Sequence, residues 1–225
     1  MICEIMFFRK MYLSRKKSPT LSEQETERLR MANLQSQLDA LKQQINPHFF
    51  FNNLNVLDSL IEEDAVRARV FLEELGAVYR YLLRCSEFQL IALASEMDFI
   101  KSYYHLLKTR LGDGLQLVIR IDQKYEACQL PPLTIQLLVE NAFIQNIVLP
   151  EQPLVITIST DSNGHLLVCN NVQRKQNVVV TNPAGLDDIL DKYRILQKEL
   201  PGITEQQGQF IVTIPLIPAI CPSIF

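Results

Sequence analysis

The spacing of apolar residues changes near residue 112 of this 225-residue chain, and this change indicates the fold class. Before the turn at Gly112-Asp113-Gly114, apolar residues recur at steps of three and four, as on one face of a helix. After that turn, residues 115–121 alternate between apolar and polar, as a half-buried strand does. The sequence therefore predicts an α+β protein, with a helical part followed by a part that contains a sheet.

The helical part begins with a coiled-coil pattern. Ser22 and Glu25 form a capping box that predicts a helix start. Five apolar residues then follow the seam of a two-stranded coiled coil, which predicts a homodimer: Met31, Leu34, Leu38, Leu41 and Ile45. We expect Pro47 to kink this helix, residues 65–85 to return as its antiparallel partner, and two such hairpins to form a four-helix bundle. A third helix is expected from Leu93 to Arg110.

The second part is expected to contain two helices and four strands. Pro131-Pro132 predicts a helix to about residue 147, and the final helix is expected over residues 186–200. Strands are expected at 115–121, 155–159, 166–169 and 210–214. The chain then divides into an N-terminus (1–20), a helical domain (21–112), an α/β sandwich (113–217) and a tail (218–225).

Charge and cysteine content narrow the functional classes. A net charge of -3 gives no electrostatic case for nucleic acid, which is bound mainly through Lys and Arg. The five cysteines are odd in number and form no C-x-x-C pair, so we expect reduced, buried thiols. No run reaches the roughly 20 apolar residues of a membrane span. Residues 1–8 are apolar and basic residues follow at once, which fits either the cytoplasmic exit of a preceding membrane segment or a surface amphipathic N-terminus.

His48 is the strongest candidate for chemistry. It stands in Gln44-Ile45-Asn46-Pro47-His48-Phe49, followed by Asn52 one helical turn later. A lone helical histidine is usually structural. This segment, however, closely resembles the phosphoacceptor segment of LytS-type sensor histidine kinases. The resemblance extends over about residues 34–217 and implies that His48 takes phosphate from ATP while Asn52 orients its ring.

A second motif resembles the nucleotide-binding helix of the same family. It reads Pro131-Pro-Leu-Thr-Ile-Gln-Leu-Leu-Val-Glu-Asn-Ala142. The resemblance implies that residues 21–112 form the dimerisation and phosphoacceptor domain and residues 113–217 a GHKL-type ATP-binding domain. It implies that Asn141 binds Mg²⁺ through its amide oxygen and that Glu140 orients water or the metal shell. A buried amphipathic helix with polar edges is the alternative interpretation.

The remaining nucleotide motifs depart from the family pattern. Ile144 and Gln145 stand where the family usually has lysine and histidine beside the phosphates. Of these two, the neutral Gln145 can still bind the nucleotide, but only through a hydrogen bond. Asn170 or Asn171 stands where an aspartate usually receives the adenine amino group, although a surface turn explains this pair equally well. The last motif is the lid, a glycine-rich segment whose backbone N–H groups approach the phosphates in the family. This chain keeps Gly185 and Leu186 of that motif, but Pro183 replaces a glycine and Asp188 replaces an asparagine.

The resemblance implies a two-component sensor histidine kinase on the cytoplasmic side of a bacterial membrane. It would autophosphorylate His48 from Mg-ATP and pass the phosphate to a response regulator. The departures predict weakened nucleotide binding. The alternative is a degenerate kinase that acts as a dimeric scaffold or phosphoacceptor.

Overall fold

The computed structural model describes residues 47–85, 88–175 and 185–219, together with Glu25, Arg28 and Arg30. The predicted coiled-coil seam, the apolar and basic N-terminus, and Pro183 lie outside the described residues. The kink expected at Pro47 stays a prediction, because the residues directly before Pro47 also lie outside this range.

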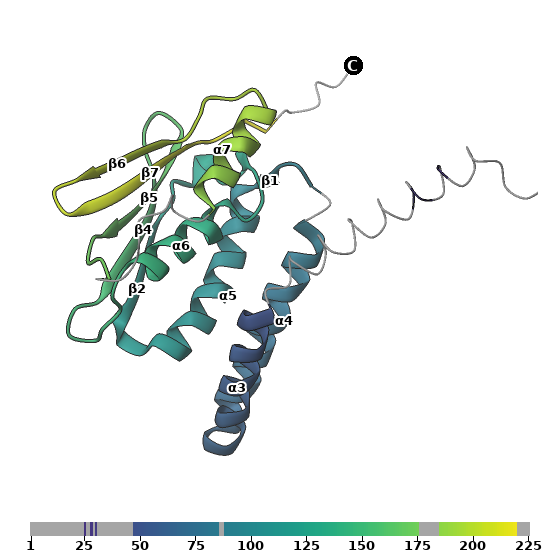
Figure 1. Ribbon diagram of the computed structural model, residues 1–225, viewed down its shortest axis with the longest axis vertical. Coiled ribbons are helices and arrows are strands. Elements are labelled where there is room, and N and C mark those ends of the chain that lie inside the picture. The colour runs from purple at the N-terminus through teal and green to yellow at the C-terminus, as the bar shows by residue number, and fades with distance from the viewer. Residues whose placement is uncertain are drawn as a thin grey trace, which may run out of the picture. The chain divides into compact units, whose positions relative to one another are not determined.

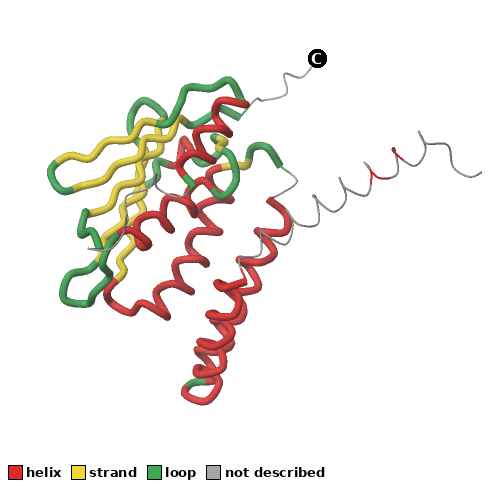
Figure 2. The backbone as a smooth tube through the Cα atoms, in the orientation of Figure 1, coloured by secondary structure: helices red, strands yellow, loops and turns green. Residues whose placement is uncertain are grey.

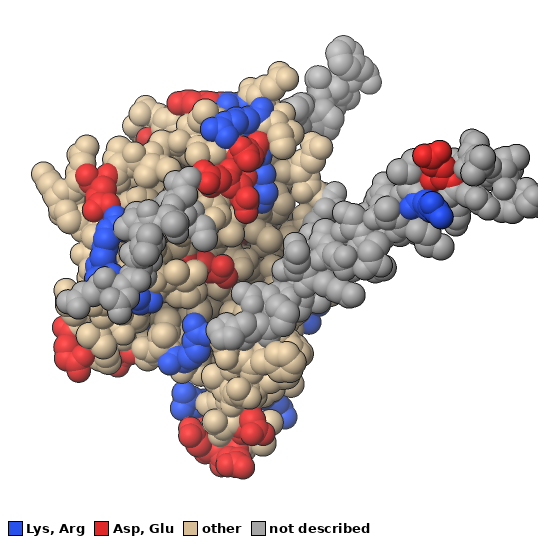
Figure 3. Space-filling model, viewed as in Figure 1, with Lys and Arg blue, Asp and Glu red and all other residues tan. Residues whose placement is uncertain are grey.

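Two antiparallel helices form a hairpin at the start of this range (Figure 1). Helix α3 (Pro47–Glu63) and helix α4 (Ala65–Cys85) are joined by Asp64 alone. The Asp64 carboxylate accepts hydrogen bonds from the backbone N–H groups of Val66 and Arg67 at 3.0 and 3.1 Å, which caps α4. Acidic side chains gather at this turn, as Figure 3 shows. The predicted return helix at residues 65–85 is confirmed.

Every third or fourth residue of α4 is buried, which gives the helix one apolar face: Ala68, Phe71, Leu75, Val78, Leu82 and Cys85. Helix α5 (Leu93–Leu111) packs against α4. The rings of Tyr81 and Phe99 stack at a centroid distance of 4.2 Å between these two helices. Gly112 ends α5 with a positive φ of 58°, as the glycine-containing turn predicts.

The rest of the described chain forms two layers (Figure 2). A mixed sheet has the order β2-β4-β5-β7-β6, in which β2 pairs with β4 in parallel and the other pairs are antiparallel. Its strands are β2 (Leu115–Arg120), β4 (Leu154–Thr160), β5 (His165–Asn171), β6 (Gly202–Gln206) and β7 (Gln209–Pro215). Helices α5, α6 (Thr134–Gln145) and α7 (Leu186–Ile195) lie along one face. The predicted α+β class is confirmed.

Short elements complete the connections between the helices and the sheet. Strands β1 (Ile91–Ala92) and β3 (Gln129–Leu130) pair with each other in antiparallel orientation. The 3₁₀ turns are Gly112–Gly114 and Gln123–Tyr125. Neither short strand was expected from the sequence.

The predicted final helix was too long. Helix α7 ends at Ile195, because Gln197 has a positive φ of 53° and the backbone N–H of Lys198 bonds back to the carbonyl of Tyr193. The following residues form β6, whose side chains are all exposed. An entirely exposed edge strand carries no apolar alternation, so the sequence pattern did not reveal it.

No helix of the described ranges is long and apolar enough to cross a membrane. The thiols of Cys85, Cys128 and Cys169 are free, and the other two cysteines fall outside the described residues.

Candidate nucleotide site

Helix α6 supplies the polar residues of the candidate site. It begins after Leu133, which adopts a left-handed conformation with φ of 64°, and the hydroxyl of Thr134 donates to the Pro131 carbonyl at 2.6 Å. This turn explains why the helix starts later than the proline pair predicts. The helix packs on α5, α7 and the sheet through a buried apolar face: Ile135, Leu138, Val139 and Ala142.

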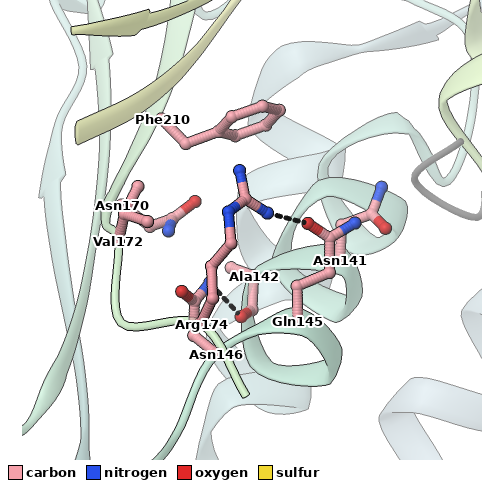
Figure 4. A pocket seen from close by; sticks show the side chains of 8 residues that line it. All are labelled: Asn141, Ala142, Gln145, Asn146, Asn170, Val172, Arg174 and Phe210. Atoms are coloured by element: carbon pink, nitrogen blue, oxygen red, sulfur yellow. Dashed lines mark hydrogen bonds between the residues drawn. The ribbon is translucent and has the colours of Figure 1, made fainter. Parts of the chain in front are cut away.

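A cavity lies where α6 faces the ends of β5 and β7 (Figure 4). Asn141, Gln145 and Asn146 line it from α6 and its C-terminal end, and Asn170 lines it from β5. The remaining wall consists of Ala142, Val172, Arg174 and Phe210. Three predicted residues, Asn141, Gln145 and Asn170, thus surround one space although they are up to 29 positions apart in the sequence.

The side chain of Arg174 occupies this space. It extends between Phe210 and the polar edge of α6, as Figure 4 shows. One guanidinium nitrogen donates to Gln145 Oε1 at 3.1 Å, and the other forms an ion pair with Glu205 on β6. The space that remains is about 10 Å³, enough for about one water molecule.

Backbone interactions fix the segment that carries Arg174. The backbone N–H of Gln173 donates to Asn146 Oδ1 at 2.8 Å, and that of Lys175 donates to the Gln145 carbonyl at 3.1 Å. The Lys175 ammonium donates to the carbonyls of Phe143 and Ile144, at 3.0 and 2.9 Å. A cation at the last carbonyls of a helix is favourable, because these carbonyls carry partial negative charge.

The two asparagines at the end of β5 have different roles. Asn171 Oδ1 accepts from the Val155 backbone N–H at 2.8 Å and its Nδ2 donates to the Pro153 carbonyl, so Asn171 joins β5 to the start of β4. Asn170 is buried, whereas Asn171 is half-buried, and the side chain of Asn170 lines the cavity, where its Nδ2 donates to the Asn171 carbonyl. Of the two candidates, Asn170 is the one that faces the site.

Glu140 points toward α5. Its Oε1 accepts from the Tyr103 hydroxyl at 2.6 Å and from Gln136 Nε2 at 2.9 Å. The Tyr103 ring stacks on that of Phe49 in α3, with centroids 5.3 Å apart. Burial and the Glu140 carboxylate raise the pKa of Tyr103 well above its ordinary value, which keeps the hydroxyl protonated as a donor.

The expected phosphoacceptor precedes this stack by one residue. His48 lies in the first turn of α3 and half-buried Asn52 lies one turn further on. On α5, next to Tyr103, the Tyr104 hydroxyl donates a hydrogen bond to the Leu115 carbonyl at 3.3 Å.

Gly185 and Leu186 lie at the start of α7 and pack against α6. Gly185 has a φ of 91°, and a Cβ atom there would lie 3.0 Å from Leu137 Cδ2. Leu186 is buried in the core and does not line the cavity. Their predicted role in nucleotide binding stays a prediction, while Asp188 is exposed in the first turn of α7.

Asn141 is the residue of this cavity whose side chain could help to hold a metal ion. Asn141 is buried, and its Nδ2 makes no hydrogen bond within the described structure. No cluster of three or more His, Cys, Asp or Glu in the described residues could hold a metal alone. A single amide oxygen is consistent with Mg²⁺, which retains water and phosphate ligands.

Sequence reasoning missed Arg174 and Phe210. Phe210 was predicted only as part of a strand. Arg174 was given no role, because it follows the strand that carries Asn170 and belongs to none of the motifs. The sequence held one useful signal for Arg174, since a basic pair follows the asparagine pair by two residues.

This chain is similar to several known proteins. The family model "Histidine kinase" matches residues 36–115. Sensor protein LytS of Oceanobacillus iheyensis is 30% identical over 159 residues, which cover 69% of this chain and 27% of that protein. Sensor histidine kinase YpdA of Escherichia coli is 35% identical over 185 residues, covering 82% and 31%. The solved Acinetobacter baumannii histidine kinase AdeS aligns at 12% identity with a TM-score of 0.39, over 84% of this chain and 98% of that one.

Sequence kinship places the chain among the histidine kinases, in agreement with a helical hairpin followed by a mixed sheet and a polar cavity on α6. Within that class, the chain belongs to the LytS-type sensor histidine kinases. It spans 27% and 31% of the lengths of these two curated relatives.

Proposed function

We propose that this chain is the kinase core of a two-component sensor and that it phosphorylates His48 from Mg-ATP. The neutral imidazole of His48 would attack the γ-phosphorus, forming an N–P bond as the bond to the ADP oxygen breaks. The phosphoryl group would then pass to an aspartate of a response regulator. The apolar and basic N-terminus supports placing this reaction on the cytoplasmic side of a bacterial membrane, after a preceding membrane segment.

Four side chains would support the reaction. Asn141 would provide an amide oxygen to Mg²⁺, and Asn170 would accept a hydrogen bond from the adenine amino group. Asn52 would orient the His48 ring from one turn away. Glu140 would hold Tyr103, and through it the start of α3, close to α6.

One observation carries the proposal. Phe49 stacks on Tyr103, and the Tyr103 hydroxyl donates a hydrogen bond to Glu140 at 2.6 Å. Glu140 directly precedes Asn141 in the sequence. This series of contacts connects the helical turn that contains His48 to the helix that lines the cavity. Two distant sequence motifs that the resemblance pairs functionally are therefore also joined by direct side-chain contacts.

The hairpin surface supports the proposed homodimer. Several large apolar side chains of α3 and α4 are between 51% and 74% exposed: Phe51, Ile61, Val66, Leu72 and Leu83. Burying such side chains against a second hairpin would stabilise a four-helix bundle. Sedimentation equilibrium should show a dimer that Ile61→Glu weakens, whereas a monomeric wild type would contradict this proposal.

A second candidate function is a dimeric scaffold or phosphoacceptor without kinase activity. The filled cavity favours it, because Arg174 leaves room for about one water molecule and ligand pockets usually offer several hundred Å³. A scaffold requires no nucleotide, so the two candidates differ in ATP binding and in labelling.

Incubation with γ-labelled ATP and Mg²⁺ separates these candidates. The kinase proposal expects acid-labile label on the wild type, loss of label in His48→Gln and in Asn141→Ala, and retention in His105→Gln. His105 is an exposed histidine on α5 and serves as the matched control. A folded wild type that neither binds ATP in calorimetry nor takes up label would refute kinase activity and favour the scaffold.

A further inference from the structure

We propose that Arg174 is a phosphate-binding residue of the nucleotide site and supplies the positive charge that α6 lacks. This inference rests on the proposed ATP binding and names a residue that its motifs do not contain. Among the described residues, Arg174 is the only charged side chain that lines the cavity.

The position of the guanidinium supports this role. It lies 3.1 Å from Gln145 Oε1, next to Asn141, and therefore at the polar edge of α6 (Figure 4). Ile144 and Gln145 are uncharged, so α6 itself offers no cation to a triphosphate. Arg174 brings a cation to this edge from a segment that follows β5.

The backbone around Arg174 is fixed while its side chain has weak partners. Hydrogen bonds on both sides, from Gln173 to Asn146 and from Lys175 to Gln145, hold the segment against the end of α6. The Arg174 guanidinium, in contrast, bonds a neutral amide and Glu205, whose side chain is 46% exposed. An exposed ion pair contributes little to stability, so a polyphosphate can compete for the guanidinium.

The chemistry of arginine favours phosphate as that competitor. The planar guanidinium can form two parallel hydrogen bonds to phosphate oxygens and stays charged at every physiological pH. When a nucleotide enters, Arg174 must leave the cavity centre, and rotation about its side-chain bonds suffices because the backbone is held. Lys175 keeps its position by bonding the carbonyls at the end of α6.

The alternative is that Arg174 simply blocks the cavity. The two roles predict opposite changes when the charge is removed. If Arg174 binds phosphate, its loss weakens binding of ligands with phosphates and spares adenosine. If it only fills the cavity, its loss strengthens binding of both.

Calorimetry with Mg-ATP and with adenosine on the full chain tests the inference. For Arg174→Gln we expect the Kd for Mg-ATP to rise roughly 10- to 100-fold, the effect of losing charge-assisted hydrogen bonds, with the Kd for adenosine unchanged. For Glu205→Gln, which frees the guanidinium, we expect about two- to fivefold tighter Mg-ATP binding. Arg120→Gln removes an exposed arginine on β2 and should change neither ligand's Kd.

Each outcome decides the inference. An unchanged or lower Kd for Mg-ATP in Arg174→Gln, or an equal rise for ATP and adenosine, overturns it even if His48 is labelled normally. A selective loss of Mg-ATP binding supports it even if His48 takes no label, in which case only the kinase proposal fails. A wild type that binds no Mg-ATP overturns both. Matching thermal unfolding curves for the variants show that the fold is intact.

Discussion

Glu96, on the first turn of α5, should make the stability of this protein depend on pH. Its side chain is fully buried, and neither carboxylate oxygen has a hydrogen-bond partner in the described structure. Burial raises the pKa of Glu96 from about 4.5 to about 7, and the nearby Leu133 backbone, Tyr81 hydroxyl and Lys192 ammonium lower it only in part. Between pH 4.5 and 7, the folded protein therefore holds a proton on Glu96 that the unfolded chain has already released.

The sign and size of the effect follow from proton linkage. Between pH 4.5 and 7 the folded state binds more protons than the unfolded state, so raising the pH lowers the free energy of unfolding. The total loss is about 3 kcal/mol, of which about 2.5 kcal/mol falls between pH 5 and 8. Neighbouring Cys85 does not titrate in this window, because burial raises its pKa to about 11.

Urea unfolding of the wild type and of Glu96→Gln between pH 5 and 8 measures this effect. Glutamine has the shape of the protonated carboxyl and does not titrate. The difference in unfolding free energy, wild type minus variant, should fall by about 2.5 kcal/mol from pH 5 to 8. Exposed Glu73→Gln should show no such fall. Parallel pH curves for the wild type and Glu96→Gln would refute the reasoning.

Three further substitutions test the packing around the site. Tyr103→Phe removes the hydrogen bond from the Tyr103 hydroxyl to Glu140 on α6. It should cost about 1–3 kcal/mol in denaturant unfolding, since the half-buried Glu140 carboxylate loses a donor. Gly185→Ala should lower the free energy of unfolding by about 1–3 kcal/mol, because φ is 91° and the added Cβ atom would lie too close to Leu137 on α6. A Cβ atom at Gly202 has room, so Gly202→Ala should cost less in the same assay. Phe71→Ala should lower the free energy of unfolding by about 3–5 kcal/mol, because the Phe71 side chain is buried in the core. The Val66 side chain is 74% exposed, so Val66→Ala should change this free energy little. Equal losses for the two variants would contradict the assigned core.

Periodicity predicted the elements that have one buried face. Helix α4 was expected at the residues where it occurs, and β2, β4, β5 and β7 were each located to within one or two residues at either end. These segments alternate apolar and polar residues at a regular spacing, because one side faces the core. Strand β6 is exposed on both sides and α7 ends at a left-handed turn, so neither boundary follows from such alternation.

The site was predicted only in the parts that motifs contain. Asn141, Gln145 and Asn170 could be named in advance, and they line one cavity. Arg174 could not, because its position depends on hydrogen bonds between the segment after β5 and the end of α6, which are far apart in sequence. The side chains of Glu140, Gly185 and Leu186 do not line this cavity, and only the folded structure distinguishes such neighbours from lining residues.

The one-residue connection at Asp64 fixes where position 48 stands along the hairpin. Because a single residue joins α3 and α4, residues at nearly equal distances from the turn lie at the same level, as the contact between the rings of Phe50 and Tyr79, with centroids 5.5 Å apart, illustrates. Inserting one residue in α3 after position 48 would move that position by about 1.5 Å along the axis and turn it by about 100° around it. The length of α3 is therefore as strict a requirement as its composition, and natural variation in chain length should fall outside this helix pair.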